Sequence, residues 1–128
     1  MVTAITEGVK ISVETIYQEE HSNPANEHFM FAYRIEVENL SAFAIQLMRR
    51  KWFIFDSNGM VREVEGEGVV GIQPVIEPGE NYAYVSACNL KTEMGSMRGD
   101  YTMHNLVQET SFKVEIPVFQ LIVPYKLN

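Results

Sequence analysis

Apolar and polar residues alternate along most of this chain with a period of two. In the clearest run, every second residue from Phe29 to Val37 is aromatic or aliphatic, while Arg34 and Glu36 fall between them. Successive side chains of a strand point to opposite faces, so such a run predicts a half-buried strand. The same pattern predicts strands over residues 9–13, 29–37, 43–54, 60–64, 82–88, 97–103, 112–116 and 119–123.

Local signals indicate how these strands are joined. The parity of the apolar positions changes between Leu47 and Trp52, which predicts a β-bulge near Arg49. Asn58 and Gly59 then form a hairpin-turn signal.

Three other segments are expected to lie outside the strands. Residues 1–8 are expected to form a short arm, and the polar residues 89–96 a long connection. Pro117 is expected to interrupt the last strand, because proline lacks the N–H group that a ladder needs.

No window of helical length shows a 3.6-residue period, so we expect an all-β protein with seven or eight strands and at most one helical turn. Trp52 lies on the strand where immunoglobulin-like domains bury a tryptophan, and Gly99-x-Tyr101-x-Met103 has the outline of their tyrosine corner. The prediction is an immunoglobulin- or fibronectin type III-like antiparallel β-sandwich, with residues 1–128 as a single domain.

The charge and the single cysteine narrow the classes of partner and compartment. The chain has 17 acidic and 10 basic residues, a net charge of -7, which disfavours nucleic acid and anionic membranes as partners. Cys88 has no second cysteine with which to form an internal disulfide, and the N-terminus lacks the pattern of a signal peptide. We therefore expect a cytoplasmic protein.

A glycine-rich stretch interrupts the strand pattern. Gly66, Gly68 and Gly71 match the spacing of the dinucleotide fingerprint, but that motif works only between a strand and a helix. Gln73 and Pro74 follow without any helical period, so we expect an ordered loop between strands. These five residues form the candidate loop for a partner or ligand, and Gln73 either ties the loop to strand backbone or faces the partner.

The sequence shows no catalytic constellation, and we expect no enzymatic activity, cofactor or metal site. His21, His28 and His104 lie on different segments without metal-ligand spacing. Cys88 has no base beside it in the sequence, so a small buried apolar role is expected.

Two charged groups leave alternatives open. Glu63, Glu65 and Glu67 share one parity, as on a solvated strand edge, with weak divalent-cation binding as the other interpretation. The basic run at residues 49–51 is a candidate contact for an anion or an acidic partner, although its side chains alternate between faces on a strand.

The C-terminal tail raises the question of self-association. Phe119, Leu121 and Val123 form an apolar alternation, and an uncovered apolar edge strand is a template for pairing. It can be covered within the chain or by a second copy, which would make a homodimer.

Five ordered blocks of the chain resemble the ApaG family. They read IQLMRRKWFIFDSNG (45–59), VEGEGVVGIQP (64–74), PGENYAYVS (78–86), GSMRGDY (95–101) and FKVEIPVF (112–119). The resemblance implies a fibronectin type III-like fold without an established catalytic activity. It also implies kinship with domains attached to F-box and polymerase-interacting proteins, and a loose link to cobalt and magnesium tolerance.

The leading hypothesis is therefore a non-enzymatic module that binds another protein through loops or edge strands. The alternative is a protein that binds a small ligand, a divalent cation such as magnesium or cobalt, or pyrophosphate through the loop from Gly66 to Gly71.

Overall fold

The computed structural model describes residues 1–127, which form strands and three short 3-10 helices. The strands are β1 (Val2–Thr6), β2 (Val9–Tyr17), β3 (Phe29–Asn39), β4 (Ile45–Asp56), β5 (Val61–Glu67), β6 (Val75–Ile76), β7 (Asn81–Leu90), β8 (Met94–Asn105) and β9 (Thr110–Ile122). The 3-10 helices are η1 (Glu19–His21), η2 (Pro24–Asn26) and η3 (Pro124–Leu127).

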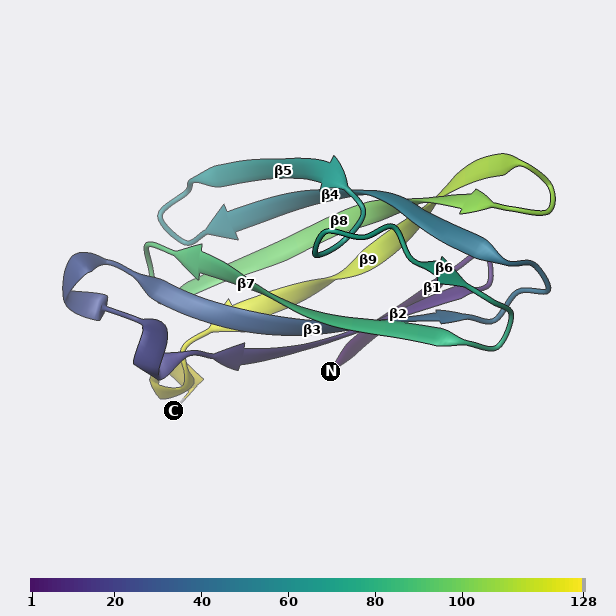
Figure 1. The fold of residues 1–128 in the computed structure, drawn as a ribbon. Coiled ribbons are helices and arrows are strands. Elements are labelled where there is room, and N and C mark those ends of the chain that lie inside the picture. The colour runs from purple at the N-terminus through teal and green to yellow at the C-terminus, as the bar shows by residue number, and fades with distance from the viewer. Residues whose placement is uncertain (128) are drawn as a thin grey trace.

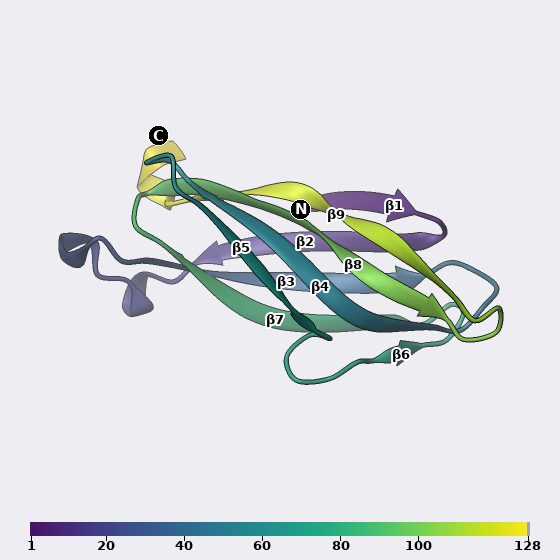
Figure 2. The same cartoon turned by 90° about the horizontal axis from the view of Figure 1, so that it is seen from above.

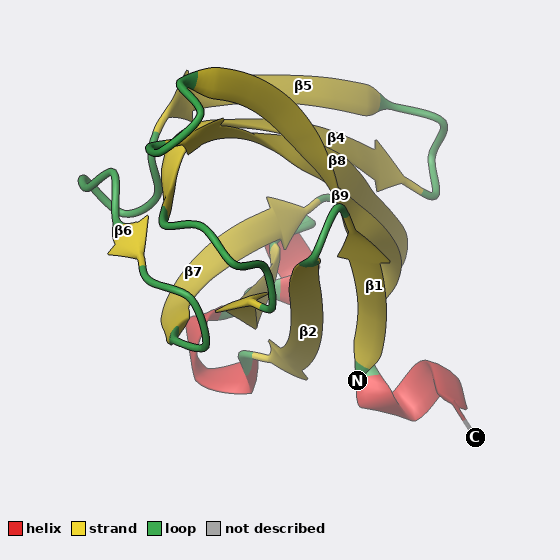
Figure 3. Cartoon of the chain, turned by 90° about the vertical axis from the view of Figure 1, so that its right-hand side faces the viewer, coloured by secondary structure: helices red, strands yellow, loops and turns green. Residues whose placement is uncertain are grey.

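The strands form two antiparallel sheets that pack face to face (Figure 1). One sheet has the order β1-β2-β3-β7, and the other has the order β5-β4-β8-β9 with β6 added to the edge of β4. Seen end-on, the two layers enclose the core between them (Figure 3). The predicted all-β antiparallel sandwich is confirmed.

The two long sides of the sandwich differ. On one side β1 packs against β9, and the Glu115 N–H donates to the Thr6 hydroxyl at 3.4 Å. On the other side β5 and β7 are edge strands, each paired with a single neighbour. We call the side between β5 and β7 the open seam. β6 and the loop before it lie alongside β7 there (Figure 2).

Aromatic rings from both sheets fill the centre of the core. Trp52 of β4 is 3% exposed, and its ring centroid lies 5.5 Å from that of Tyr33 in the opposite sheet. Phe119 of β9 packs edge-on against Trp52 at 5.8 Å. Such tilted and edge-to-face pairs add to the free energy gained by burial. The predicted placement of Trp52 between the sheets is confirmed.

The expected irregularities of β4 are also present. Its register with β8 shifts between Leu47 and Arg49, so the bulge lies at Met48, next to the predicted position. The turn after β4 is closed by the Gly59 N–H, which donates to the Asp56 carbonyl at 2.9 Å.

The strand count and the N-terminal arm were predicted wrongly. Residues 1–127 contain nine strands instead of seven or eight, and three 3-10 helices instead of one helical turn. Most of the expected arm is β1, which pairs with β2 through a tight turn at Glu7 and Gly8. Both turn residues have positive φ, 47° and 78°, as is typical of a tight hairpin turn. Of the two, only Gly8 is a residue type that signals such a turn in the sequence.

Of the two expected breaks, the long connection is wrong and the break of the ladder at Pro117 is confirmed. Residues 89–96 are not a long connection, because β7 continues to Leu90 and β8 begins at Met94. The short turn between them is held by the Asp56 carboxylate, which accepts from the Lys91 N–H at 2.7 Å. At Pro117 the ladder with β8 is irregular, because the register shifts between residues 97 and 99, although β9 itself continues to Ile122.

The tyrosine corner is wrong as well. Tyr101 lies in the middle of β8, and its hydroxyl bonds with the hydroxyl of Tyr84 on β7 of the other sheet. Gly99 is needed for close packing, since a Cβ there would lie 2.0 Å from the Lys51 carbonyl oxygen.

The apolar tail is covered within the chain. Phe119, Leu121 and Val123 are 2%, 0% and 0% exposed. Of the two expected kinds of cover, within the chain or by a second copy, the structure shows the first for these side chains. These three side chains therefore do not need a second copy of the chain to bury them.

Candidate functional site

The predicted site, residues 66–74, is a loop that spans an interruption in one sheet edge. β4 pairs with β5 through residues 49–55 and with β6 through residues 45 and 46. Between these two pairings lies Met48, the bulged residue, which has no strand partner on this edge. We call residues 66–74 the glycine loop.

Side-chain and backbone groups of the loop bond to β4 across this interruption. The Met48 carbonyl accepts from the Gly68 N–H at 2.8 Å and from Gln73 Nε2 at 3.0 Å. The buried Pro74 accepts the Leu47 N–H through its carbonyl at 3.0 Å. Gln46 Nε2 donates to the Gln73 carbonyl, also at 3.0 Å. Of the two roles expected for Gln73, the structural one is confirmed.

The tip of the loop is a miniature hairpin. Val69 and Ile72 exchange two backbone hydrogen bonds, of 2.8 and 3.1 Å, around Val70 and Gly71. The φ values of these two residues are 47° and 81°, so the turn has the positive φ at both central positions that defines type I′. Val69 is fully buried and anchors the hairpin in the core.

Each glycine has a separate structural reason. A Cβ on Gly68 would lie 2.0 Å from the Ile72 carbonyl oxygen, and one on Gly66 would lie 2.8 Å from Nη1 of Arg50. Gly71 has open space around it and is required only by its positive φ. The loop leads into β6 and not into a helix, as expected, so the dinucleotide context is missing.

The loop exposes apolar side chains. Val70 is 64% exposed, Ile72 48% and Val75, at the start of β6, 49%. The loop therefore combines a backbone held by hydrogen bonds with an apolar outer surface.

The basic run beside the loop is divided between two faces. Lys51 Nζ lies 3.6 Å from Glu63 and 3.7 Å from Glu65, and Arg49 Nη2 lies 4.0 Å from Glu65, all on the outer face. Glu63 and Glu65 are therefore already paired with positive groups of the chain. Arg50 points the other way, and its Nη1 donates to the carbonyls of residues 67 and 68 at 3.1 and 3.0 Å.

A hollow of about 210 Å³ opens in the seam beneath Arg50. Tyr33 and Ser86 line this hollow. Burial raises the pKa of the Tyr33 phenol, whereas the hydrogen bond with Ser86 and the charge of Arg50 lower it. Trp52 lies in the rear wall, and Arg62 enters from β5. The remaining lining residues are Ile54, Val64, Ala87, Cys88, Asn89 and Met97.

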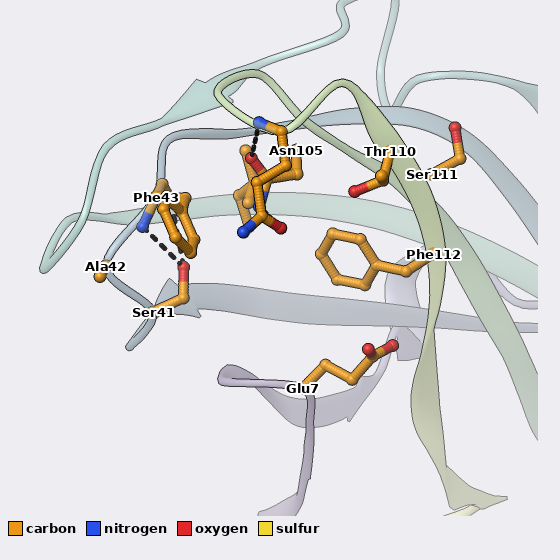
Figure 4. Close-up of a pocket in the computed structure, with 10 residues that line it drawn as sticks. Glu7, Ser41, Ala42, Phe43, Asn105, Thr110, Ser111 and Phe112 are labelled. Atoms are coloured by element: carbon orange, nitrogen blue, oxygen red, sulfur yellow. Dashed lines mark hydrogen bonds between the residues drawn. The ribbon is translucent and has the colours of Figure 1, made fainter.

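A second hollow, of about 420 Å³, lies at the end of the sandwich between three turns (Figure 4). The Phe112 ring projects into it, with Phe43 across from it and Glu7 and Ser41 below. The side-chain oxygen of Asn105 is already used, since it accepts the N–H groups of residues 107 and 108. The sequence reasoning did not find this hollow, because its walls come from segments far apart in the chain.

The residues with catalytic or metal-binding potential remain dispersed. His104 lies on β8, 3.5 Å from the Ser111 hydroxyl, whereas His21 ends η1 and His28 immediately precedes β3. Within residues 1–127, no three His, Cys, Asp or Glu side chains are placed to hold a metal ion. Cys88 is 7% exposed, and burial raises the pKa of its thiol, which disfavours the reactive thiolate form.

Comparison with known proteins identifies the family. The model of the ApaG domain matches residues 19–105, and the ApaG protein of Proteus mirabilis is 45% identical over 120 residues, which are 94% of this chain and 95% of that one. The chain belongs to the ApaG family. The ApaG protein of Methylobacterium radiotolerans is 44% identical over 125 residues, covering 98% and 95% of the two chains.

A solved structure shows the same fold. The crystal structure of an ApaA protein from Bordetella pertussis has a TM-score of 0.87 and 38% sequence identity, covering 91% of this chain and 94% of that chain. The ApaG relatives match nearly the whole chain, including β9, which lies beyond the matched domain boundary. Among the described residues, no helix is both long and apolar enough to cross a membrane.

Proposed function

We propose that this ApaG protein is a non-enzymatic binding module, and that the tip of the glycine loop contacts a protein partner. The observation that carries the proposal is Val70, a β-branched residue held at φ 47° with 64% of its surface exposed. A β-branched side chain is unfavourable in left-handed backbone, and Asn or Gly is usual at this position of a type I′ turn. Strain of this kind is concentrated at functional sites.

The surroundings of Val70 explain how the strain is maintained. Gly68, Gln73 and Pro74 bond to the bulged part of β4, and Val69 is buried beneath the tip. The loop is therefore ordered before a partner arrives, so binding does not cost the entropy of ordering it. Ile72 adds a second exposed apolar side chain to the tip. Apolar side chains on a rigid loop suit a protein surface better than a charged ligand.

The alternative, in which the glycine loop binds magnesium, cobalt or pyrophosphate, has less support. A backbone anion site needs free N–H groups, but those of Gly68, Val69 and Ile72 donate to carbonyls of the chain. The net charge of -7 also favours a protein partner over nucleic acid or an anionic membrane. We place the protein in the cytoplasm on the grounds of its single cysteine, Cys88.

The test is a matched pair of substitutions, Val70→Asn and Val107→Asn. Both valines are 64% exposed on turns, and Val107 lies in the β8–β9 turn, away from the glycine loop. Asparagine suits left-handed backbone, so Val70→Asn relieves strain while removing the apolar tip and is expected to raise stability by about 1 kcal/mol. Each protein is used as bait in quantitative affinity purification from the native cell.

We expect wild type and the Val107→Asn protein to retain the same partner, and the Val70→Asn protein to lose it. A Val70→Asn protein that is folded and still retains every partner of the wild type would refute the loop-tip site. The melting temperature of each bait separates loss of binding from loss of fold.

A further inference from the structure

Two arginines face the hollow in the open seam without a carboxylate partner. Arg50 uses only Nη1 for the loop carbonyls, and Arg62 uses Nη2 for the Asn89 carbonyl. Among the described residues, the five ion pairs within 4.0 Å include neither arginine. A guanidinium has five N–H donors, so each retains donors for a ligand.

In the part of the chain that the structure describes, no acidic side chain lines this hollow. Asp56 lines a separate hollow on the other side of Arg62, where its two carboxylate oxygens accept from the Lys91 N–H and the Thr92 hydroxyl. Glu63 and Glu65 point to the outer face and pair with residues 49 and 51. The described lining thus carries two positive groups and no negative one, on a chain whose net charge is -7.

The remaining walls define the rest of the ligand. The Tyr33 and Ser86 side chains offer hydroxyl groups on the β3–β7 side, and Trp52, Ile54 and Met97 form an apolar wall opposite. The volume of about 210 Å³ is smaller than the pockets, roughly 300–1,000 Å³, that hold drug-sized molecules. The ligand must therefore be small and have both an anionic and an apolar part.

We propose that this hollow binds a small organic oxyanion, either a carboxylate or a phosphate monoester with a short apolar body. Arg50 and Arg62 supply charged N–H donors, whose planar forks match both kinds of oxyanion. Tyr33 and Ser86 bond to the same head group, and the apolar body lies against Trp52. This site is separate from the loop tip and does not depend on the proposed protein partner.

Trp52 is the one tryptophan of the chain, so its fluorescence reports on the hollow. The probes are acetate, butyrate, inorganic phosphate and butyl phosphate, each titrated against chloride at matched ionic strength, because salt alone screens exposed charges. We expect a saturable change for butyrate or butyl phosphate, at lower concentration than for acetate or inorganic phosphate. The stronger member of the pair identifies the head group as carboxylate or phosphate.

Three variants connect the signal to the arginines. Arg62→Gln is expected to weaken binding by about tenfold or more, and Arg62→Lys by less, because it retains the charge and loses the fork. Arg34→Gln is the control, since Arg34 lies on the outer face of β3 with Glu36 at 3.3 Å. The Arg34→Gln control should bind the probes as the wild type does. In NMR spectra of the wild type, adding the probe should shift the backbone amides of Ser86 and its neighbours.

Two results would overturn the proposal. The first is no saturable change with any of the four probes up to about 10 mM. The second is equal weakening by Arg34→Gln and Arg62→Gln, which would show a diffuse effect of charge and not a site. Melting curves of all variants show whether a loss of binding reflects a loss of fold.

Discussion

Gly68 and Gly71 both have positive φ, but alanine should affect them very differently. At Gly71 a Cβ meets nothing within 4 Å, so Gly71→Ala costs only the strain of left-handed backbone, about 1 kcal/mol. At Gly68 the new Cβ would lie 2.0 Å from the Ile72 carbonyl oxygen. Real Cβ atoms essentially never come within 3.0 Å of such a neighbour. The Ile72 peptide must therefore move.

The cost of that movement follows from the hydrogen bonds around it. Displacing Ile72 breaks its two bonds with Val69, of 2.8 and 3.1 Å, and loosens the 2.8 Å bond from the Gly68 N–H to Met48. A neutral hydrogen bond contributes about 1 kcal/mol net. Together with the backbone strain, Gly68→Ala should lower the free energy of unfolding by about 3–4 kcal/mol.

Thermal unfolding followed by circular dichroism measures the difference. For a domain of this size, 1 kcal/mol corresponds to roughly 3–5 °C in melting temperature. We expect a decrease of roughly 10–20 °C for Gly68→Ala and of roughly 3–5 °C for Gly71→Ala. Equal decreases for the two variants would refute the reasoning, since both share the positive φ and only Gly68 has the close carbonyl.

Three further predictions concern the core. Trp52→Ala should lower the free energy of unfolding by about 3–5 kcal/mol, because it empties the centre of the aromatic cluster, and an unchanged melting temperature would contradict this. Burial raises the pKa values of Tyr33, Tyr84 and Tyr101 above 10.0, so the folded chain keeps protons that the unfolded chain releases. The free energy of unfolding should therefore not depend on these tyrosines below pH 10, and above it should fall by up to about 1.4 kcal/mol per pH unit for each. A melting temperature that stays constant through the alkaline range would contradict this pH dependence. Deleting residues 119–128 should abolish cooperative unfolding, because three core side chains are lost, whereas a folded truncated monomer in light scattering and circular dichroism would show that the tail is dispensable.

The amino-acid sequence by itself determined the fold class. Period-two alternation identified most strands, because one face of each strand is buried and the other is solvated. It also placed Trp52 in the core and the glycine loop between strands. It failed at β1 and at the short turn after Leu90, where pairing with neighbouring strands extends the ladders beyond a weak local signal.

The tertiary structure alone decided how the candidate sites are built. The bulge at Met48 sets the parity of β4, and so sends Arg50 inward to the seam while Arg49 and Lys51 face solvent. The positive φ of Val70 results from hydrogen bonds that close the loop onto β4, and nothing in a valine predicts it. Alternation is a property of neighbouring residues, whereas these features depend on contacts between segments that meet only when the sheets have formed.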